Sequence, residues 1–183
     1  MSEYSIKLVQ NAGVDTDTLV KLLISNAASE LSTYYHYGIL QANLNGLEGA
    51  GLKEIVETAK IEDRIHYEAL VVRIYELGGT LPETLNDFYN QASCPPAFLP
   101  CDKTDIKETV RVLRDAERCA MAGYQKICKM TFDKDYRTYD LALAILHEET
   151  EHECQFSEIL GESADLRAVR KGAPSPFVSR FLR

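Results

Sequence analysis

The stretch DRIH, residues 63–66, places a carboxylate three positions before a histidine, and ETEH, residues 149–152, repeats that order in the second half of the chain. Residues three apart on a helix share a face, with about 5 to 6 Å between their Cβ atoms, so each pair can converge on one point. A lone glutamate precedes each pair, Glu30 by 33 residues and Glu117 by 32. These matching intervals predict six groups at similar depth in a helical bundle.

The segments around these groups have the periodicity of amphipathic helices. Apolar residues recur at steps of three and four, and glycine-containing breaks such as Asn45-Gly46 and Gly78-Gly79 separate the periodic runs. The pattern predicts four helices, over residues of about 15–45, 48–77, 104–130 and 136–160. No run alternates with the period of two that strands require, so the predicted fold class is all-α.

The connections between these helices predict their arrangement. Two are short, whereas the central one contains Pro82, Pro95, Pro96 and Pro100 and cannot continue a helix. An antiparallel pair, a long crossover and a second antiparallel pair have the connectivity of a ferritin-like four-helix bundle. We therefore expect an N-terminal arm over 1–14, the bundle over 15–163, and a tail over 164–183 that forms a short helix or an arm against a neighbouring subunit.

Length and charge restrict the functional classes. A chain of 183 residues suits one domain. It contains no apolar run of about 18 residues and no recognisable signal peptide, so we expect a cytoplasmic protein without a membrane partner. A net charge of -8 and a pI of about 5.1 favour cations over nucleic acid as partners, because phosphate binding needs a positive surface.

The paired motifs predict a dinuclear metal site. Two lone glutamates and two carboxylate-histidine turns are the ligand set of di-iron and di-manganese helical bundles. Oxygen donors with one imidazole per ion suit iron or manganese, whereas structural zinc sites have more sulfur and nitrogen. Desolvation makes each buried, unpaired carboxylate cost several kcal/mol. Two divalent cations would offset this cost.

Taken singly, these motifs have plainer interpretations. A lone glutamate on a helix usually reaches solvent, and one carboxylate-x-x-His turn arises by chance in acidic helices. In the first half, Glu62 lies four residues before His66 on nearly the same face as Asp63, so either can supply the ligand. Tyr37 lies seven residues after Glu30 on its face and is either a core tyrosine or a group that hydrogen-bonds a ligand or donates an electron.

The combination of motifs resembles the Dps-like proteins of archaea and anaerobic bacteria, members of the ferritin superfamily between Dps and bacterioferritin. The segments that carry the resemblance span nearly the whole chain; they are residues 62–68, 73–79, 93–96, 116–120, 137–142 and 175–179.

The resemblance implies a hollow dodecamer of identical subunits. Each subunit would hold a bacterioferritin-like di-iron centre that oxidises Fe(II) with hydrogen peroxide, stores the ferric product and protects against oxidative stress. Bacterioferritin's haem-ligating methionine would stand two residues before His66, where this chain has Arg64, so haem is not expected. The ligands carried over by motif are Glu30, Asp63 or Glu62, His66, Glu117, Glu149 and His152.

The family also implies a cysteine pair near the metal centre, and Cys94 and Cys119 match those positions. On a helical wheel Cys119 lies about 200° from Glu117 and faces away from the metals. It can still meet Cys94 if the crossover packs on that outer face. The alternative is two buried, inert thiols, and the sequence leaves open whether a disulfide forms.

Two other functions compete with a ferroxidase cage. One is a di-manganese catalase or a rubrerythrin-type peroxidase, although the chain lacks the paired C-x-x-C motifs of a rubredoxin domain. The other is a DNA-binding or purely structural cage. Support for DNA contact is limited to the basic tail, which contains Arg167, Arg170, Lys171, Arg180 and Arg183.

Overall fold

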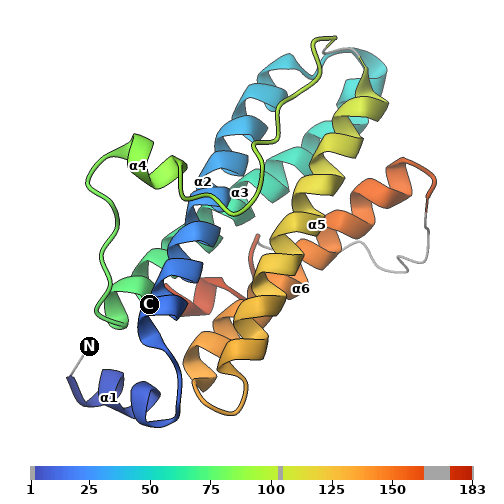
Figure 1. Cartoon of the computed structure of the whole chain (residues 1–183). Helices are drawn as coiled ribbons and strands as arrows, with labels where there is room; N and C mark the ends of the chain where they lie inside the picture. The colour runs from blue at the N-terminus through green and yellow to red at the C-terminus, as the bar shows by residue number, and fades with distance from the viewer. Residues whose placement is uncertain (1–2, 103–104, 163–173, 183) are drawn as a thin grey trace.

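The computed structural model describes residues 3–102, 105–162 and 174–182. Four long helices form a bundle, which confirms the prediction of an all-α four-helix fold, and the described residues contain no strand (Figure 1). The elements are α1 (Glu3–Asn11), α2 (Thr16–Asn43), α3 (Gly46–Glu76), α4 (Leu85–Tyr89), α5 (Ile106–Thr131), α6 (Tyr136–Ile159) and the 3-10 helix η1 (Ser179–Phe181).

The bundle consists of two helix pairs. Helices α2 and α3 pack together, as do α5 and α6, and the long crossover that carries α4 joins the pairs (Figure 1). Aspartates cap three of the four long helices: Asp15, Asp105 and Asp135 each accept a hydrogen bond from a backbone N–H three residues on. Gly78, at φ +81°, follows the C-terminal end of α3 in a conformation that favours glycine.

Both ends of the chain contain a short helix. Residues 1–14, predicted as an arm, contain helix α1, and Val9 of this helix is buried. Within the predicted tail, residues 174–182 form a turn and η1, and Val178 is fully buried against the bundle. The rest of that tail, including Arg167, Arg170 and Lys171, lies outside the described residues, as does Arg183.

Apolar side chains occupy both ends of the bundle interior. One cluster includes Leu23 and Ile74, and the other includes Tyr37, Val56 and Phe156. Acidic and histidine side chains lie between the two clusters along the helices. None of the helices in the described parts of the chain is sufficiently long and apolar to cross a membrane.

The buried arginine near the end of α3, Arg73, does not neutralise this acidic band. Arg73 is 3% exposed, and its guanidinium donates to Asp135 Oδ2 at 2.7 Å and to Thr138 Oγ1 at 2.7 Å. Glu76 accepts a third contact at 3.0 Å. The Arg73 network therefore stabilises the junction of α3 with the start of α6, and its charge is balanced there.

We expect Gly123→Ala to lower the free energy of unfolding by about 1 to 3 kcal/mol, the usual cost of overpacking. A Cβ at Gly123 of α5 would overlap Oδ1 of Asn26 and lie 3.2 Å from its Cγ. Asn26 of α2 is 2% exposed and donates to Leu22 O at 2.8 Å, so it cannot swing away freely. Urea titration measures the change.

Gly38→Ala is the matched control for this substitution. Gly38 also lies inside a long helix, but a Cβ there meets nothing within 4 Å. The control should raise stability by about 0.5 to 1 kcal/mol, because alanine favours the helix over the unfolded chain. Equal stabilisation by both changes would show that α2 and α5 do not approach closely at Gly123.

Candidate metal centre

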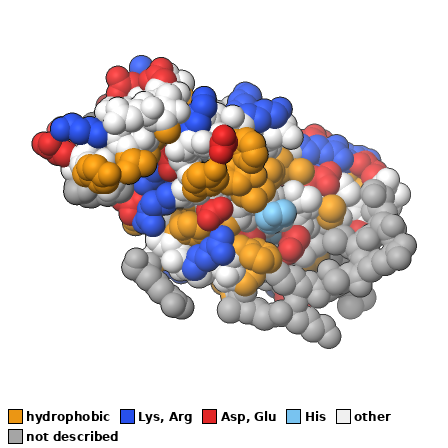
Figure 2. Space-filling view, turned by 90° about the horizontal axis from the view of Figure 1, so that it is seen from below, with side chains coloured by type: hydrophobic (Ala, Val, Ile, Leu, Met, Phe, Trp, Pro, Cys, Tyr) orange, Lys and Arg blue, Asp and Glu red, His pale blue; other side chains and the backbone are white. Residues whose placement is uncertain are grey.

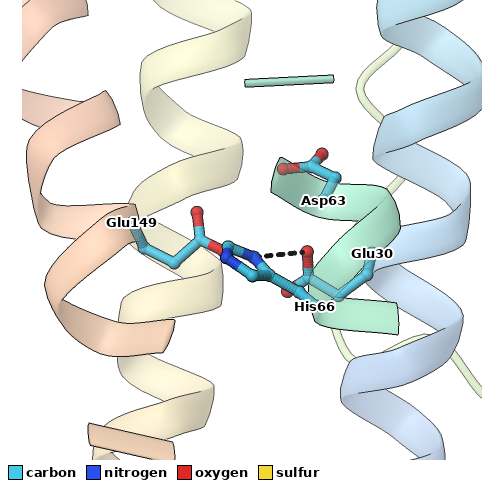
Figure 3. Close-up of side chains that lie close together, drawn as sticks. All are labelled: Glu30, Asp63, His66 and Glu149. Carbon is cyan, nitrogen blue, oxygen red and sulfur yellow. Dashed lines mark ion pairs between the residues drawn. The ribbon is translucent and has the colours of Figure 1, made fainter. Parts of the chain in front are cut away.

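The six groups singled out by the sequence spacing lie together inside the bundle. Ligand atoms from Glu30, Asp63, His66 and Glu149 form one cluster, within 4.8 Å of one another. Figure 3 shows these four side chains reaching from α2, α3 and α6 into the space between the helices. A second cluster shares Glu149 with the first; its members are Glu117, Glu149 and His152.

Both histidines turn Nδ1 toward these clusters. His66 Nδ1 lies 2.8 Å from Glu149 Oε1 and 3.4 Å from Glu30 Oε2. His152 Nδ1 lies 3.3 Å from Glu149 Oε2 and 3.9 Å from Glu117 Oε2. The carboxylate shared by the two clusters therefore lies between the two imidazoles, where it can bridge two cations.

Asp63 provides the clearest sign that a cation belongs here. The residue is 1% exposed, and neither carboxylate oxygen has a hydrogen-bond partner among the described residues. Burial raises the pKa of Asp63 well above its usual value, and the charges of Glu30, Glu117 and Glu149 raise it further. A buried carboxylate without a partner is costly, so a divalent cation fits this set of donors.

Glu62, the alternative ligand, occupies a different position. Its Oε2 lies 2.7 Å from His152 Nε2, on the side of the ring away from the cluster. Glu148 does the same for His66, with Oε2 2.8 Å from Nε2. Each histidine is thus held by a carboxylate from the other half of the chain. Our sequence interpretation missed Glu148, although a second carboxylate directly precedes both Asp63 and Glu149.

Tyr37 belongs to a symmetric pair of tyrosines. Its hydroxyl donates to Glu117 Oε1, and the hydroxyl of Tyr124 donates to Glu30 Oε1 at 2.5 Å. Burial and the neighbouring glutamate charge raise the pKa of each phenol well above 10, so both remain protonated donors. The sequence signal for Tyr124 was its position seven residues after Glu117, which matches the spacing from Glu30 to Tyr37.

The electrostatics of the site favour protonated groups when no metal is bound. Burial raises the pKa of Glu117 to about 7, with the Glu149 charge adding to the shift and His152 opposing it. Burial alone would lower the pKa values of His66 and His152. Contacts with Glu149 and the other surrounding carboxylates outweigh burial and raise both pKa values well above 6.5. Metal binding must therefore displace protons.

Cys94 and Cys119 form a disulfide on the outer side of α5, with their Cα atoms 5.8 Å apart. This bond joins the crossover to α5, and hydrogen bonds join the same segment to α2: Ser29 Oγ accepts from Cys94 N and Ser93 N, both at 3.1 Å. The two sulfurs belong to neither carboxylate cluster. The free cysteines are Cys101, Cys128 and Cys154.

Comparison with known proteins places this arrangement in context. The family model described as a ferritin-like domain matches residues 20–165. The chain is 52% identical over its full length to the DNA protection during starvation protein of Pyrococcus furiosus, covering 99% of that protein.

Solved structures resemble the fold over most of the chain. A dodecameric thioferritin from Bacteroides fragilis, described as bacterioferritin-related, is 29% identical, with a TM-score of 0.82 over 88% of this chain and 94% of that one. A Dps protein from Vibrio cholerae, described as belonging to a superfamily of ferritin-like diiron-carboxylate proteins, has a TM-score of 0.71. It is 16% identical, and the match covers 79% of this chain and 90% of that one, so it shows similarity of fold alone.

Proposed function

The chain belongs to the ferritin-like domain family, as its resemblance to Dps-like proteins indicated, and we propose that it oxidises Fe(II) with hydrogen peroxide and stores the ferric product in a self-assembled cage. The observation that carries the proposal is the buried Asp63 carboxylate, which has no hydrogen-bond partner among the described residues and shares its cluster with Glu30, His66 and Glu149. This donor set requires cations, and hard oxygen donors favour the higher charge of Fe(III).

Two Fe(II) ions are the substrate that fits the two clusters. Glu30, Asp63 and His66 would hold one ion, Glu117 and His152 the other, and Glu149 would contact both. Each Fe(II) gives up one electron, and the two electrons reduce one hydrogen peroxide to two water molecules with uptake of two protons. Removing both reactants together suppresses hydroxyl-radical formation, which is a protective function.

The protein contributes positioning and electrostatics to this reaction. Tyr37 and Tyr124 fix the orientation of Glu117 and Glu30 through their hydroxyl groups. All six ligands are at most 4% exposed, so the carboxylates meet the cations in an environment where charge interactions are strong. We propose Tyr37 as a positioning residue and, as inferred from the sequence, a candidate electron donor.

Self-assembly is proposed from the surface as well as from the relatives. Large hydrophobic side chains including Tyr35, Leu85 and Phe98 are 65 to 71% exposed. Tyr35, Leu85 and Phe98 also line an apolar groove of about 730 Å³ between α2 and the crossover. On the face seen in Figure 2, hydrophobic side chains gather among charged ones. Exposed apolar surface of this kind marks protein contacts, and the Bacteroides fragilis relative is described as dodecameric.

The acidic character of the chain bears on how it would protect DNA. The Pyrococcus furiosus relative is named for DNA protection, and a net charge of -8 disfavours wrapping duplex DNA on the subunit surface. We therefore propose protection through removal of Fe(II) and peroxide. Manganese also suits these donors, and a manganese centre would make a catalase the alternative activity.

Anaerobic addition of two Fe(II) per subunit, followed by one equivalent of hydrogen peroxide or dioxygen, tests the proposal. Absorbance of the ferric product should appear with peroxide, and Glu117→Ala should slow it at least about 100-fold, as expected when a metal ligand is lost. Glu158→Ala is the matched control, since Glu158 is exposed on α6. Oxidation by Glu117→Ala at the parent rate would contradict the site, and elution as a monomer would contradict the cage.

A further inference from the structure

The two carboxylates behind the histidines form a crossed arrangement. Glu148 of α6 contacts His66 of α3, whereas Glu62 of α3 contacts His152 of α6, at 2.8 and 2.7 Å. Both carboxylates are 0% exposed. A metal-binding histidine commonly donates its second N–H to a carboxylate, which fixes the ring and its tautomer. Here that contact leaves Nδ1 of each ring facing the clusters.

A short C-terminal segment, residues 174–179, closes over both carboxylates, and η1 at its end packs against α3 (Figure 1). Ser175 reaches both of them: its backbone N–H donates to Glu62 Oε1 at 2.8 Å, and its hydroxyl donates to Glu148 Oε2 at 2.7 Å. The backbone N–H groups of Phe177 and Val178 donate to Glu148 Oε1 at 3.0 and 3.3 Å. One turn of chain therefore supplies four donors to the two carboxylates.

The local structure of this turn is specialised for that contact. Ser175 is 0% exposed and has φ +50°, a backbone conformation uncommon for residues other than glycine. Such conformations persist only when surrounding contacts hold them. Its contacts include the bonds to Glu62 and Glu148 and a bond from Ser179 Oγ to Ser175 O at 2.7 Å. Val178, 0% exposed, anchors the segment in the apolar core.

We propose that residues 174–179 act as a clasp that positions His66 and His152 for metal binding through Glu148 and Glu62. The inference rests on the proposed function, because it takes these histidines as metal ligands. Ser175 is a positioning residue that does not touch the metal. Its hydroxyl and His66 Nε2 share one acceptor, Glu148 Oε2, so the hydroxyl holds the oxygen that orients the ring.

Co(II) titration of the metal-free protein, by calorimetry and visible absorption, tests the clasp. Ser175→Ala should lower the affinity for the ion held by His66 about 10-fold, which is the lower end of the cost of losing such a supporting group. The affinity for the other ion should not change. Ser175→Gly should have the same effect. Because glycine readily adopts φ +50°, this variant provides the test if the alanine variant does not fold. Thr58→Ala, which also loses one hydroxyl hydrogen bond but lies outside the clasp, should bind both ions normally.

A double-mutant cycle shows whether Ser175 acts through Glu148. In a Glu148→Gln background, Ser175→Ala should produce no further loss of Co(II) affinity. If the parent binds two Co(II) per subunit and both Ser175 variants bind them with parental affinity, the clasp is wrong while the metal centre stands. If the parent binds no Co(II), the metal centre itself is wrong. Equal weakening by Ser175→Ala and Thr58→Ala would show that loss of any hydroxyl hydrogen bond weakens the site, and it would overturn the inference.

Discussion

Asp63→Asn is expected to stabilise the metal-free protein and to weaken the binding of at least one metal ion by about 100-fold or more, the scale set by losses of metal-site groups. Both effects have one cause. The Asp63 carboxylate is buried and has no hydrogen-bond partner among the described residues, while three other carboxylate charges act on it. Without a cation this group opposes folding, and with one it becomes a ligand.

Thermal unfolding and Co(II) titration measure the two effects separately. The amide should raise the unfolding temperature in the presence of a chelator, by several degrees if it relieves about 1 to 2 kcal/mol. It should also remove much of the stabilisation that saturating Co(II) gives the parent protein. Such opposite effects on stability and function are typical of sites built from groups that oppose folding.

Two control variants separate this explanation from others. Asp140→Asn makes the same change at an exposed position of α6 and should leave stability and affinity nearly unchanged. Glu62→Gln should weaken metal binding less than Asp63→Asn does, because Glu62 contacts a histidine rather than the cluster. A larger loss from Glu62→Gln would place Glu62 in the ligand position and contradict the register proposed here.

The spacing of the motifs was sufficient to predict the bundle and to propose the six ligands. Helical periodicity is a local property, and equal intervals in both halves place groups at one depth whatever the packing details. The spacing of the motifs did not decide between Asp63 and Glu62, since residues three and four before His66 share a face. That choice depends on how α3 is rotated against its neighbours.

The supporting groups were harder to predict because their contacts join distant parts of the chain. Ser175 meets Glu62 across 113 residues, and Tyr124 meets Glu30 across 94. Neither contact produces a periodic pattern within a single segment of the sequence. The repeat itself held partial signals, however: a second carboxylate before each ligand carboxylate, and a tyrosine seven residues after each lone glutamate. Internal symmetry therefore carries information about supporting residues as well as ligands.

The metal-free and metal-loaded forms should respond to pH in opposite directions. In the metal-free protein, the pKa values of His66 and His152 are raised well above 6.5, and that of Glu117 is raised to about 7. A raised folded-state pKa means that the folded protein keeps a proton that the unfolded chain releases. The corresponding stability is complete below the unfolded pKa, near 4.5 for Glu117 and 6.5 for the histidines, and is lost as pH rises through the folded pKa.

Unfolding temperatures measured from pH 5.5 to 8.5 should therefore fall with rising pH when a chelator is present. Glu148 and Glu149 do not reverse the trend, because their pKa values are lowered from 4.5 and their stabilisation is lost only in more acidic solution. With Co(II), each proton displaced from a ligand makes affinity rise about 10-fold per pH unit. Stabilisation by the metal should grow over the same range.

Asp63→Asn sharpens this test, because it removes a carboxyl group whose own pKa burial raises well above its usual value. Its metal-free form should lose less stability between pH 5.5 and 8.5 than the parent does, whereas Asp140→Asn should follow the parent. Parallel pH curves for the metal-free and Co(II)-loaded parent would mean that no protons leave on binding. The buried carboxylates and imidazoles would then not be the ligands, because cations and protons compete for the same atoms in any site built from them.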